Sequence, residues 1–149
     1  MSEITVDVIH ENLKRVGGYG GIYVPEFTFG DKRADAAIIN LKKRWVRCFE
    51  IKVNRSDWVQ DKKWTTYSEF CSSLAVVCPG GLIQPEEISK PFGLLWVQQG
   101  KYGIELKWKK KAQNFQKRDS LAWLYTYVKV IEQEFPRIYS QNEQFKKQV

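Results

Sequence analysis

Apolar side chains recur at two different periods in the first hundred residues, and the change of period marks where a helix gives way to strands. Residues 4–16 place apolar side chains three or four positions apart, which puts them on one side of a helix: Val6, Ile9, Leu13 and Val16. Gly17 and Gly18 follow directly and favour the end of that helix. The sequence therefore predicts an N-terminal helix with one apolar face.

Three strands are expected after this helix, because β-branched and aromatic residues are frequent in three consecutive segments, Ile22–Phe29, Arg33–Asn40 and Arg44–Val53. The connections between them are a few residues long and contain turn-forming residues. Parallel neighbours need a crossover of about a dozen residues or more. We therefore expect these three strands to form an antiparallel meander.

A second helix and further strands are predicted beyond the meander. Residues 54–57 offer several helix-capping side chains, and a helix is expected over Asp57–Phe70. Apolar runs then predict three more strands, the last of them at a sheet edge: Leu74–Cys78, Gly93–Val97 and Tyr102–Trp108. The predicted fold class is α/β, with a mixed central sheet flanked by helices.

The C-terminal part of the chain has a different pattern. Residues 113–120 are polar, and Leu121–Phe135 then carries apolar residues at helical spacing. We expect a core domain over residues 1–111 and a C-terminal helical extension over residues 112–149. This extension is expected to pack on the same domain or on a partner, and a homodimer through the helix is one arrangement that it favours.

Composition narrows the function. The chain has 149 residues, enough for one domain with a sizeable core, and a formal net charge of +7. A basic balance favours a polyanionic partner, nucleic acid first and an anionic membrane surface second. The sequence contains no apolar run of membrane-spanning length and no signal peptide, so a cytoplasmic protein without a membrane partner is expected. The three cysteines are spaced as buried reduced thiols rather than as a zinc site, and His10 is the sole histidine.

Three polar residues on neighbouring predicted strands supply candidate chemistry. Glu50 and Lys52 lie two residues apart and face the same side of their strand, either as an exposed ion pair or as part of a site. Asp35 lies on the preceding strand, so two carboxylates from adjacent strands can converge on one cation. Mg²⁺ prefers such oxygen ligands, and the Ile51 carbonyl can supply another. A lysine beside the metal would orient or help to deprotonate the attacking water and stabilise charge on a phosphate. These are the components of metal-assisted phosphodiester hydrolysis.

The spacing Asp35…Glu50-x-Lys52 within this strand order resembles the PD-(D/E)XK nuclease superfamily. The surrounding segments are similar to its MmcB-like branch, whose members are assigned to DNA repair: Pro25-Glu26, Arg33-Ala34-Asp35, Phe49-Glu50-Ile51-Lys52, Ser56-Asp57-Trp58 and Asp61-Lys62-Lys63-Trp64, followed by Tyr67 and Cys71. The resemblance covers residues 4–97. Alanine stands at position 34, where the motif's name has a proline.

The resemblance implies a restriction-endonuclease-like core and a nuclease that depends on Mg²⁺ or Mn²⁺. Asp35 and Glu50 would be metal ligands and Lys52 the catalytic lysine, while Glu26 matches a further acidic position. Many members also place a glutamate from the first helix in the site. The candidates here are Glu3 and Glu11, although the helical pattern turns Glu11 towards solvent.

Several residues keep two interpretations. Three basic residues could either contact phosphate or cover the exterior of a helix: Arg55, Lys62 and Lys63. The lysines of residues 107–111 could either form the solvated surface of an edge strand or form a phosphate-binding patch around a tryptophan. Asp57 and Asp61 could support the metal ligands, and Asp57, near the start of a helix, could instead cap it. Trp64 and Tyr67 are expected in the core rather than as rings that stack on bases.

DNA is the expected partner, with RNA left open. A catalytically silent nucleic-acid-binding protein is the alternative function, and a small structural subunit that docks through the C-terminal helix is the third.

Overall fold

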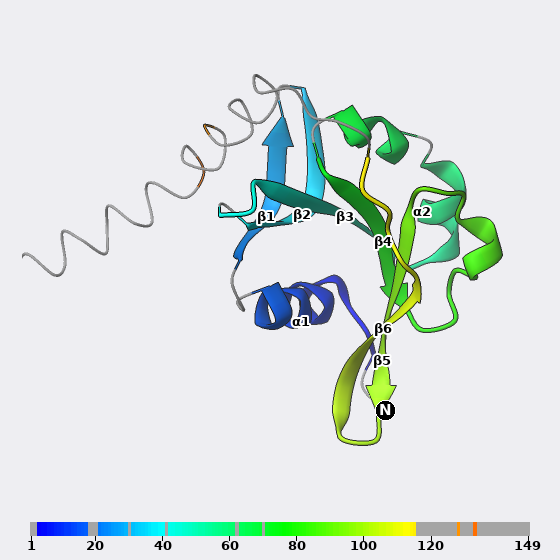
Figure 1. Ribbon diagram of the computed structural model, residues 1–149. Coiled ribbons are helices and arrows are strands. Elements are labelled where there is room, and N and C mark those ends of the chain that lie inside the picture. Colours follow the sequence, from blue (N-terminus) through cyan, green and yellow to red (C-terminus); the bar gives the residue numbers. More distant parts are fainter. Residues whose placement is uncertain are drawn as a thin grey trace, which may run out of the picture.

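The computed structural model describes residues 3–17, 21–29, 31–40, 42–61, 63–69 and 71–115, together with residues 128 and 133 (Figure 1). The elements follow one another in the order helix α1 (Val6–Gly17), strands β1 (Ile22–Phe29), β2 (Lys32–Asn40) and β3 (Trp45–Ile51), helix α2 (Arg55–Gln60), 3₁₀ helix η1 (Trp64–Glu69), strand β4 (Ser73–Pro79), 3₁₀ helix η2 (Pro85–Glu87) and strands β5 (Gly93–Gly100) and β6 (Gly103–Lys110).

The strands form one six-stranded mixed sheet in the order β1-β2-β3-β4-β5-β6. The first three are antiparallel neighbours, β4 is parallel to β3, β5 is parallel to β4, and β6 returns antiparallel. The predicted α/β class, the antiparallel meander and the edge position of the last strand are confirmed. α2 and η1 lie in the β3–β4 connection, which is long enough for a parallel crossover.

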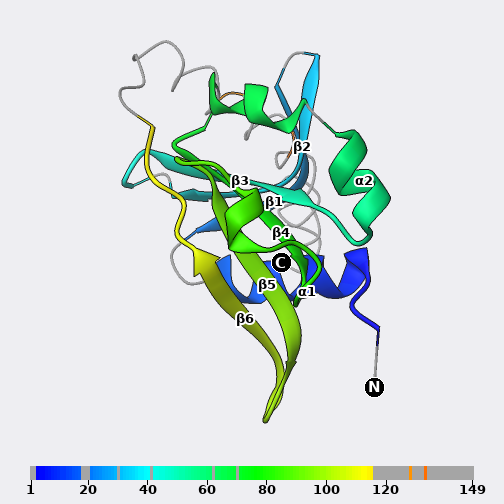
Figure 2. The same cartoon turned by 90° about the vertical axis from the view of Figure 1, so that its right-hand side faces the viewer.

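Helix α1 covers one face of the sheet and lies below β1, β2 and β3 in both views (Figures 1 and 2). Its buried residues Ile9 and Leu13 pack with Phe49 and Ile51 of β3, as the alternation along β3 predicts. The predicted apolar stripe is only half right, because Val6 and the last residue of the stripe, Val16, remain exposed. Helix α1 therefore docks through its middle.

The second core lies on the opposite face of the sheet. Cys48 of β3 and Leu74 of β4 pack there with Trp64 of η1 and with Ile83 and Ile88 from the β4–β5 connection. Strand β3 is thus covered on both faces, which explains why its residues 48–51 are all buried, whichever face they point to. The cysteines at positions 48, 71 and 78 are buried and form no disulfide, as predicted.

The predicted single helix at residues 57–70 is wrong. The chain forms the short helix α2, breaks at Asp61 and continues as η1. Asp61 has extended backbone angles, and its side chain accepts hydrogen bonds from the Lys63 backbone N–H at 2.9 Å and from the Lys52 ammonium at 2.5 Å. A side chain that bonds its own backbone and a buried lysine competes with helix continuation. The cap of α2 is Asn54, which accepts from the Asp57 N–H at 2.9 Å.

The predicted C-terminal helix lies outside the described residues, apart from positions 128 and 133. Residues just before it join the core: the backbone N–H groups of Gln113 and Phe115 donate to the carbonyls of Pro91 and Ser72. Within the described part of the chain, no helix has both the length and the apolar character needed to cross a bilayer.

Helix α1 offers a matched test of this packing. Ile9→Ala is expected to lower the free energy of unfolding by about 2–5 kcal/mol, because it opens a cavity between the helix and β3. Val6→Ala, on an exposed position of the same helix, should change it by no more than about 0.5 kcal/mol. Urea denaturation followed by circular dichroism measures both, and equal effects would contradict docking through the middle of α1.

Candidate active site

An open pocket of about 480 Å³ lies on the sheet face that carries α2 and η1. Its lining is polar and combines four acidic side chains with two basic ones, in a chain whose net charge is +7. The lining residues are Arg33, Asp35, Glu50, Ile51, Lys52, Asp57, Gln60, Asp61 and Tyr67. An acidic pocket in a basic protein is suited to a cation or a cationic group.

Asp35 and Glu50 face each other at the end of the β2–β3 pairing. Ala36 pairs with Phe49, so the next pair along the antiparallel register is Asp35 with Glu50. The side chain of Asp35 is fixed by the Ile51 backbone N–H, which donates to its Oδ2 at 2.8 Å. Both carboxylates therefore project from directly opposed backbone positions into one pocket, as the sequence pattern predicts.

The carboxyl group of Glu50 is buried without sufficient compensation. The residue is 4% exposed, and among the described groups its Oε1 atom has no hydrogen-bond partner. Burial raises the pKa of Glu50, and the negative charge of Asp35 raises it further; Lys52 opposes this shift only in part. Burial also raises the pKa of Asp35, against the hydrogen bond from Ile51 and the charge of Lys52. Two neighbouring carboxyl groups with raised pKa values are typical of a site that binds a positively charged group.

Lys52 lies between two carboxylates. Its Nζ atom is 3.7 Å from Glu50 Oε2 and 2.5 Å from Asp61 Oδ2, and the residue is 8% exposed. Burial pushes the pKa of Asp61 upward, but the hydrogen bonds from Lys52 and from the Lys63 backbone outweigh burial, and the pKa of Asp61 is lowered. Asp61 is thus the stronger partner of the ammonium group, and Glu50 is left with a weaker contact.

Tyr67 and Arg33 complete the pocket and were not predicted as site residues. Tyr67 was expected in the core; it packs partly there, but it also lines the pocket. Burial, followed by the charges of Glu50 and Asp61, raises the pKa of Tyr67 to about 12. Arg33 is exposed at the pocket, two residues before Asp35 on β2. The alternation along β2, which turns residues 33 and 35 the same way, is the signal that would have found Arg33.

His10, on α1, lies near enough to the site for its charge to lower the pKa of Asp35. It forms a hydrogen bond through Nδ1 to the hydroxyl of Tyr23 on β1. Burial raises the pKa of Tyr23, and the charge of Asp35 adds to the effect, which links the pair electrostatically to the carboxylates. Glu11 and Glu3, the first-helix candidates, are exposed and do not line the pocket.

The other predicted contact residues are distributed unevenly. Glu26 is exposed on β1 with a left-handed φ of 51° and does not line the pocket. The guanidinium of Arg55 is held by both carboxylate oxygens of Glu87, at 2.8 and 2.9 Å, so its charge is already offset. Lys63 is exposed two residues after Asp61. Lys62 lies outside the described residues.

The pocket fits a hard divalent cation that takes part of its ligand shell from solvent or substrate. In the described part of the chain, no three His, Cys, Asp or Glu side chains gather closely enough to hold a metal by themselves. Asp35 and Glu50 supply two carboxylates, and Ile51 lines the same pocket. Mg²⁺ is commonly bound by one or two carboxylates together with water and substrate phosphate. The unpartnered Glu50 Oε1 provides the free acceptor that such a cation requires.

Comparison with known proteins establishes the fold. No protein-family model matches the sequence, and neither does any curated protein. Among solved structures, the chain is similar to SPO1766, a protein of unknown function from Silicibacter pomeroyi, with a TM-score of 0.70 and 20% identity over 89% of this chain and 87% of that one. The two proteins therefore share a fold.

Two further structures are much less similar. SfsA from Pyrococcus furiosus, in complex with Ca²⁺, gives a TM-score of 0.37 at 14% identity over 71% of this chain, and SSO0001 gives 0.29 at 15% identity over 85%. The matches span 60% and 59% of those chains. Likeness at this level carries nothing about the site, so the nuclease resemblance stays a prediction from the motif.

The uncompensated carboxylate predicts an unusual stability effect. Glu50→Gln is expected to raise the free energy of unfolding of the metal-free protein at neutral pH by about 1–2 kcal/mol, because the amide keeps the shape and requires neither a buried charge nor the uptake of a proton on folding. Urea denaturation in the presence of EDTA measures it. Glu11→Gln, on the exposed side of α1, is the matched control and should have little effect.

The same comparison has a defined pH dependence. Because the pKa of Glu50 is raised on folding, the folded protein binds more protons than the unfolded chain above the ordinary range of a glutamate. Stability of the wild-type protein should therefore fall relative to Glu50→Gln as the pH rises from about 5 through neutrality. A difference that is constant over this range would contradict the burial of an uncompensated acid.

Proposed function

We propose that this protein is a divalent-metal-dependent nuclease that hydrolyses phosphodiester bonds of DNA. The observation that carries the proposal is the pair of opposed carboxylates, Asp35 and Glu50, of which Glu50 is buried with a free oxygen beside the ammonium group of Lys52. These are the three positions that the PD-(D/E)XK pattern assigns to metal binding and catalysis. The strand order of the sheet and the open polar pocket are consistent with that assignment.

The reaction adds water across a phosphorus–oxygen bond, so that the water oxygen joins phosphorus and a proton reaches the leaving oxygen. Asp35, Glu50 and the Ile51 carbonyl are the groups that would hold the cation. A bound Mg²⁺ or Mn²⁺ supplies positive charge to the phosphate and lowers the pKa of a coordinated water. The pKa values of Glu50 and Asp35 are raised because the two acids lie close together and are buried, and a bound cation would favour their ionised forms.

Lys52 is arranged as a donor. Its ammonium group contacts Asp61 at 2.5 Å and Glu50 at 3.7 Å, so its charge is held beside the two carboxylates. In this position it would orient the attacking water and stabilise negative charge on the phosphate. Asp61 positions Lys52, because its short contact draws the ammonium away from Glu50.

The substrate would reach this group through the open side of the pocket. Arg33 lines the pocket, and Lys63 lies exposed two residues beyond Asp61. Both can contact phosphates on either side of the bond to be cut. Arg55 is paired with Glu87 and is assigned a structural role.

Metal binding is the first test. Titration of Mn²⁺ into the wild-type protein, followed by calorimetry, should give a saturable heat that is lost in Asp35→Asn and Glu50→Gln and retained in Glu11→Gln. Bound metal should also raise the melting temperature of the wild-type protein alone, since it binds only the folded site. Binding that persists in both carboxylate variants would place the metal elsewhere.

Cleavage is the second test. With Mg²⁺ or Mn²⁺, Lys52→Ala is expected to lower kcat by about 10²–10³-fold while Mn²⁺ binding is retained, because the variant removes a charge that acts on the transition state. Lys101→Ala, at the tip of the β5–β6 hairpin, is the control and should cleave normally. A panel of duplex, flap and single-stranded DNA and of RNA defines the substrate.

Two outcomes would overturn the proposal. Cleavage that is unchanged in Lys52→Ala points to a contaminating enzyme. Salt-dependent nucleic-acid binding without turnover on any substrate supports the catalytically silent binding protein instead.

A further inference from the structure

An arginine lies between two tryptophan rings on the sheet face opposite the pocket. The guanidinium carbon of Arg47, on β3, is 4.6 Å from the ring centre of Trp45 and 4.9 Å from that of Trp108 on β6. Trp45 and Trp108 come from opposite ends of the chain's core, and β4 and β5 lie between their strands in the sheet. The side chain of Arg47 therefore bridges across the sheet, which gives the cluster a fixed geometry.

Hydrogen bonds hold the cluster in place. Arg47 donates through Nε to Ser73 Oγ at 3.0 Å, and Ser73 is the residue that pairs with it on β4. The indole N–H of Trp45 donates to Asn114 Oδ1 at 3.0 Å. Burial lowers the pKa of Arg47, and among the described residues no carboxylate lies within salt-bridge distance of it. A half-buried cation held by two rings and one Nε hydrogen bond leaves its terminal guanidinium N–H groups for an external anion.

The segments that carry the cluster are basic throughout. Residues 40–49 contain Lys42, Lys43 and Arg44 besides Arg47, and residues 106–111 contain four lysines, with no acidic residue in either segment. Lys42, Lys43 and Arg44, in the β2–β3 turn, are exposed. Two of the four β6 lysines are already engaged: Lys110 donates to the Ile88 carbonyl, and the Lys109 ammonium lies 4.6 Å from the ring centre of Trp96. The exposed cations of the β2–β3 turn beside Arg47 would attract a polyanion.

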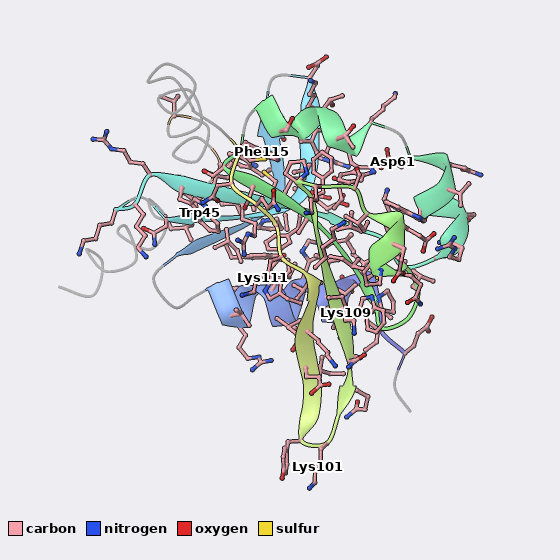
Figure 3. The ribbon with its side chains drawn as sticks, turned by 45° about the vertical axis from the view of Figure 1, so that its right-hand side comes forward. Trp45, Asp61, Lys101, Lys109, Lys111 and Phe115 are labelled. Carbon is pink, nitrogen blue, oxygen red and sulfur yellow. The ribbon has the colours of Figure 1, made fainter. Side chains whose placement is uncertain are left out.

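A small hollow adjoins the cluster. It has a volume of about 180 Å³ and lies between the C-terminal end of α1 and the side chains of Trp45 and Arg47, with Ile38 as an apolar wall. Trp108 adds an exposed ring, 36% accessible, on the other side of Arg47. Figure 3 shows Trp45 on the opposite side of the molecule from Asp61, which contacts Lys52.

We propose that Trp45, Arg47 and Trp108 form a binding surface for single-stranded nucleic acid, separate from the pocket of Asp35 and Glu50. Exposed aromatic rings bind unpaired bases by stacking, and arginine and lysine contact the phosphates. Bases of a duplex are already stacked on one another, so their faces are not free for Trp108. The surface does not depend on the proposed nuclease activity, since it contains none of the residues of the pocket.

Binding in EDTA tests this surface without metal and without cleavage. Fluorescence anisotropy of a short labelled oligothymidylate should show saturable binding by the wild-type protein that weakens as salt is raised. Trp108→Ala should lose about tenfold in affinity, and Trp108→Phe should recover most of it, because one stacked base contributes about 1–3 kcal/mol. Recovery in the phenylalanine variant distinguishes stacking from a loss of folding.

The controls separate this surface from others. Tyr102→Ala removes an aromatic ring that is 93% exposed at the β5–β6 hairpin tip and should bind as the wild type does. Lys42→Ala with Lys43→Ala should lower both the affinity and its salt dependence.

The proposal would be overturned if the affinity of Trp108→Ala were within twofold of wild type, or if a blunt duplex bound equally well. Displacement of the oligonucleotide by an equal charge concentration of polyglutamate would also overturn it, in favour of an acidic protein partner. If cleavage fails but binding follows this pattern, the surface stands and the nuclease does not.

Discussion

The close opposition of two carboxylates at the end of one β-hairpin is the constraint on which the candidate site depends. Antiparallel register places Asp35 and Glu50 opposite each other, and burial on both faces of β3 keeps water away from Glu50. A sequence selected only for folding would replace one of the acids, because buried like charges oppose ionisation. The pairing therefore costs stability, and the proposed cation site would account for that cost.

The positive charge of Lys52 offsets the repulsion between Asp35 and Glu50 only in part, because the ammonium group is bound more closely by Asp61. The break between α2 and η1 sets the position of Asp61, whose side chain bonds Lys52 and the following backbone at the same time. An uninterrupted helix would satisfy the Lys63 N–H through a main-chain carbonyl instead, and the Asp61 side chain would no longer be fixed from both sides. The break between α2 and η1 and the position of Asp61 in the site therefore have one cause: the helix ends at the residue that bonds the buried ammonium of Lys52.

Most of the fold followed from periodicity, and the parts that did not depend on tertiary contacts. The meander and the edge strand were predictable because strand alternation and short turns are local properties. The broken helix was not, since residues 57–70 have helical character in the sequence, and the break occurs at Asp61, whose side chain bonds Lys52 and the Lys63 backbone. Within the site, Asp35, Glu50 and Lys52 were found by spacing. Tyr67 was assigned to the core because an apolar ring at helical spacing does not reveal that its hydroxyl faces three acids.

Strand β3 links the two surfaces. Arg47 and Glu50 are three residues apart, about 10 Å along the strand, and odd spacing places them on opposite faces of the sheet. A nucleic acid at the tryptophan rings consequently cannot enter the pocket without passing around the sheet. The two surfaces would then contact different parts of one molecule, with an unpaired segment on one face and the phosphodiester bond on the other. A substrate with a junction between paired and unpaired regions could bind both surfaces at once, whereas a uniform duplex could bind only the pocket.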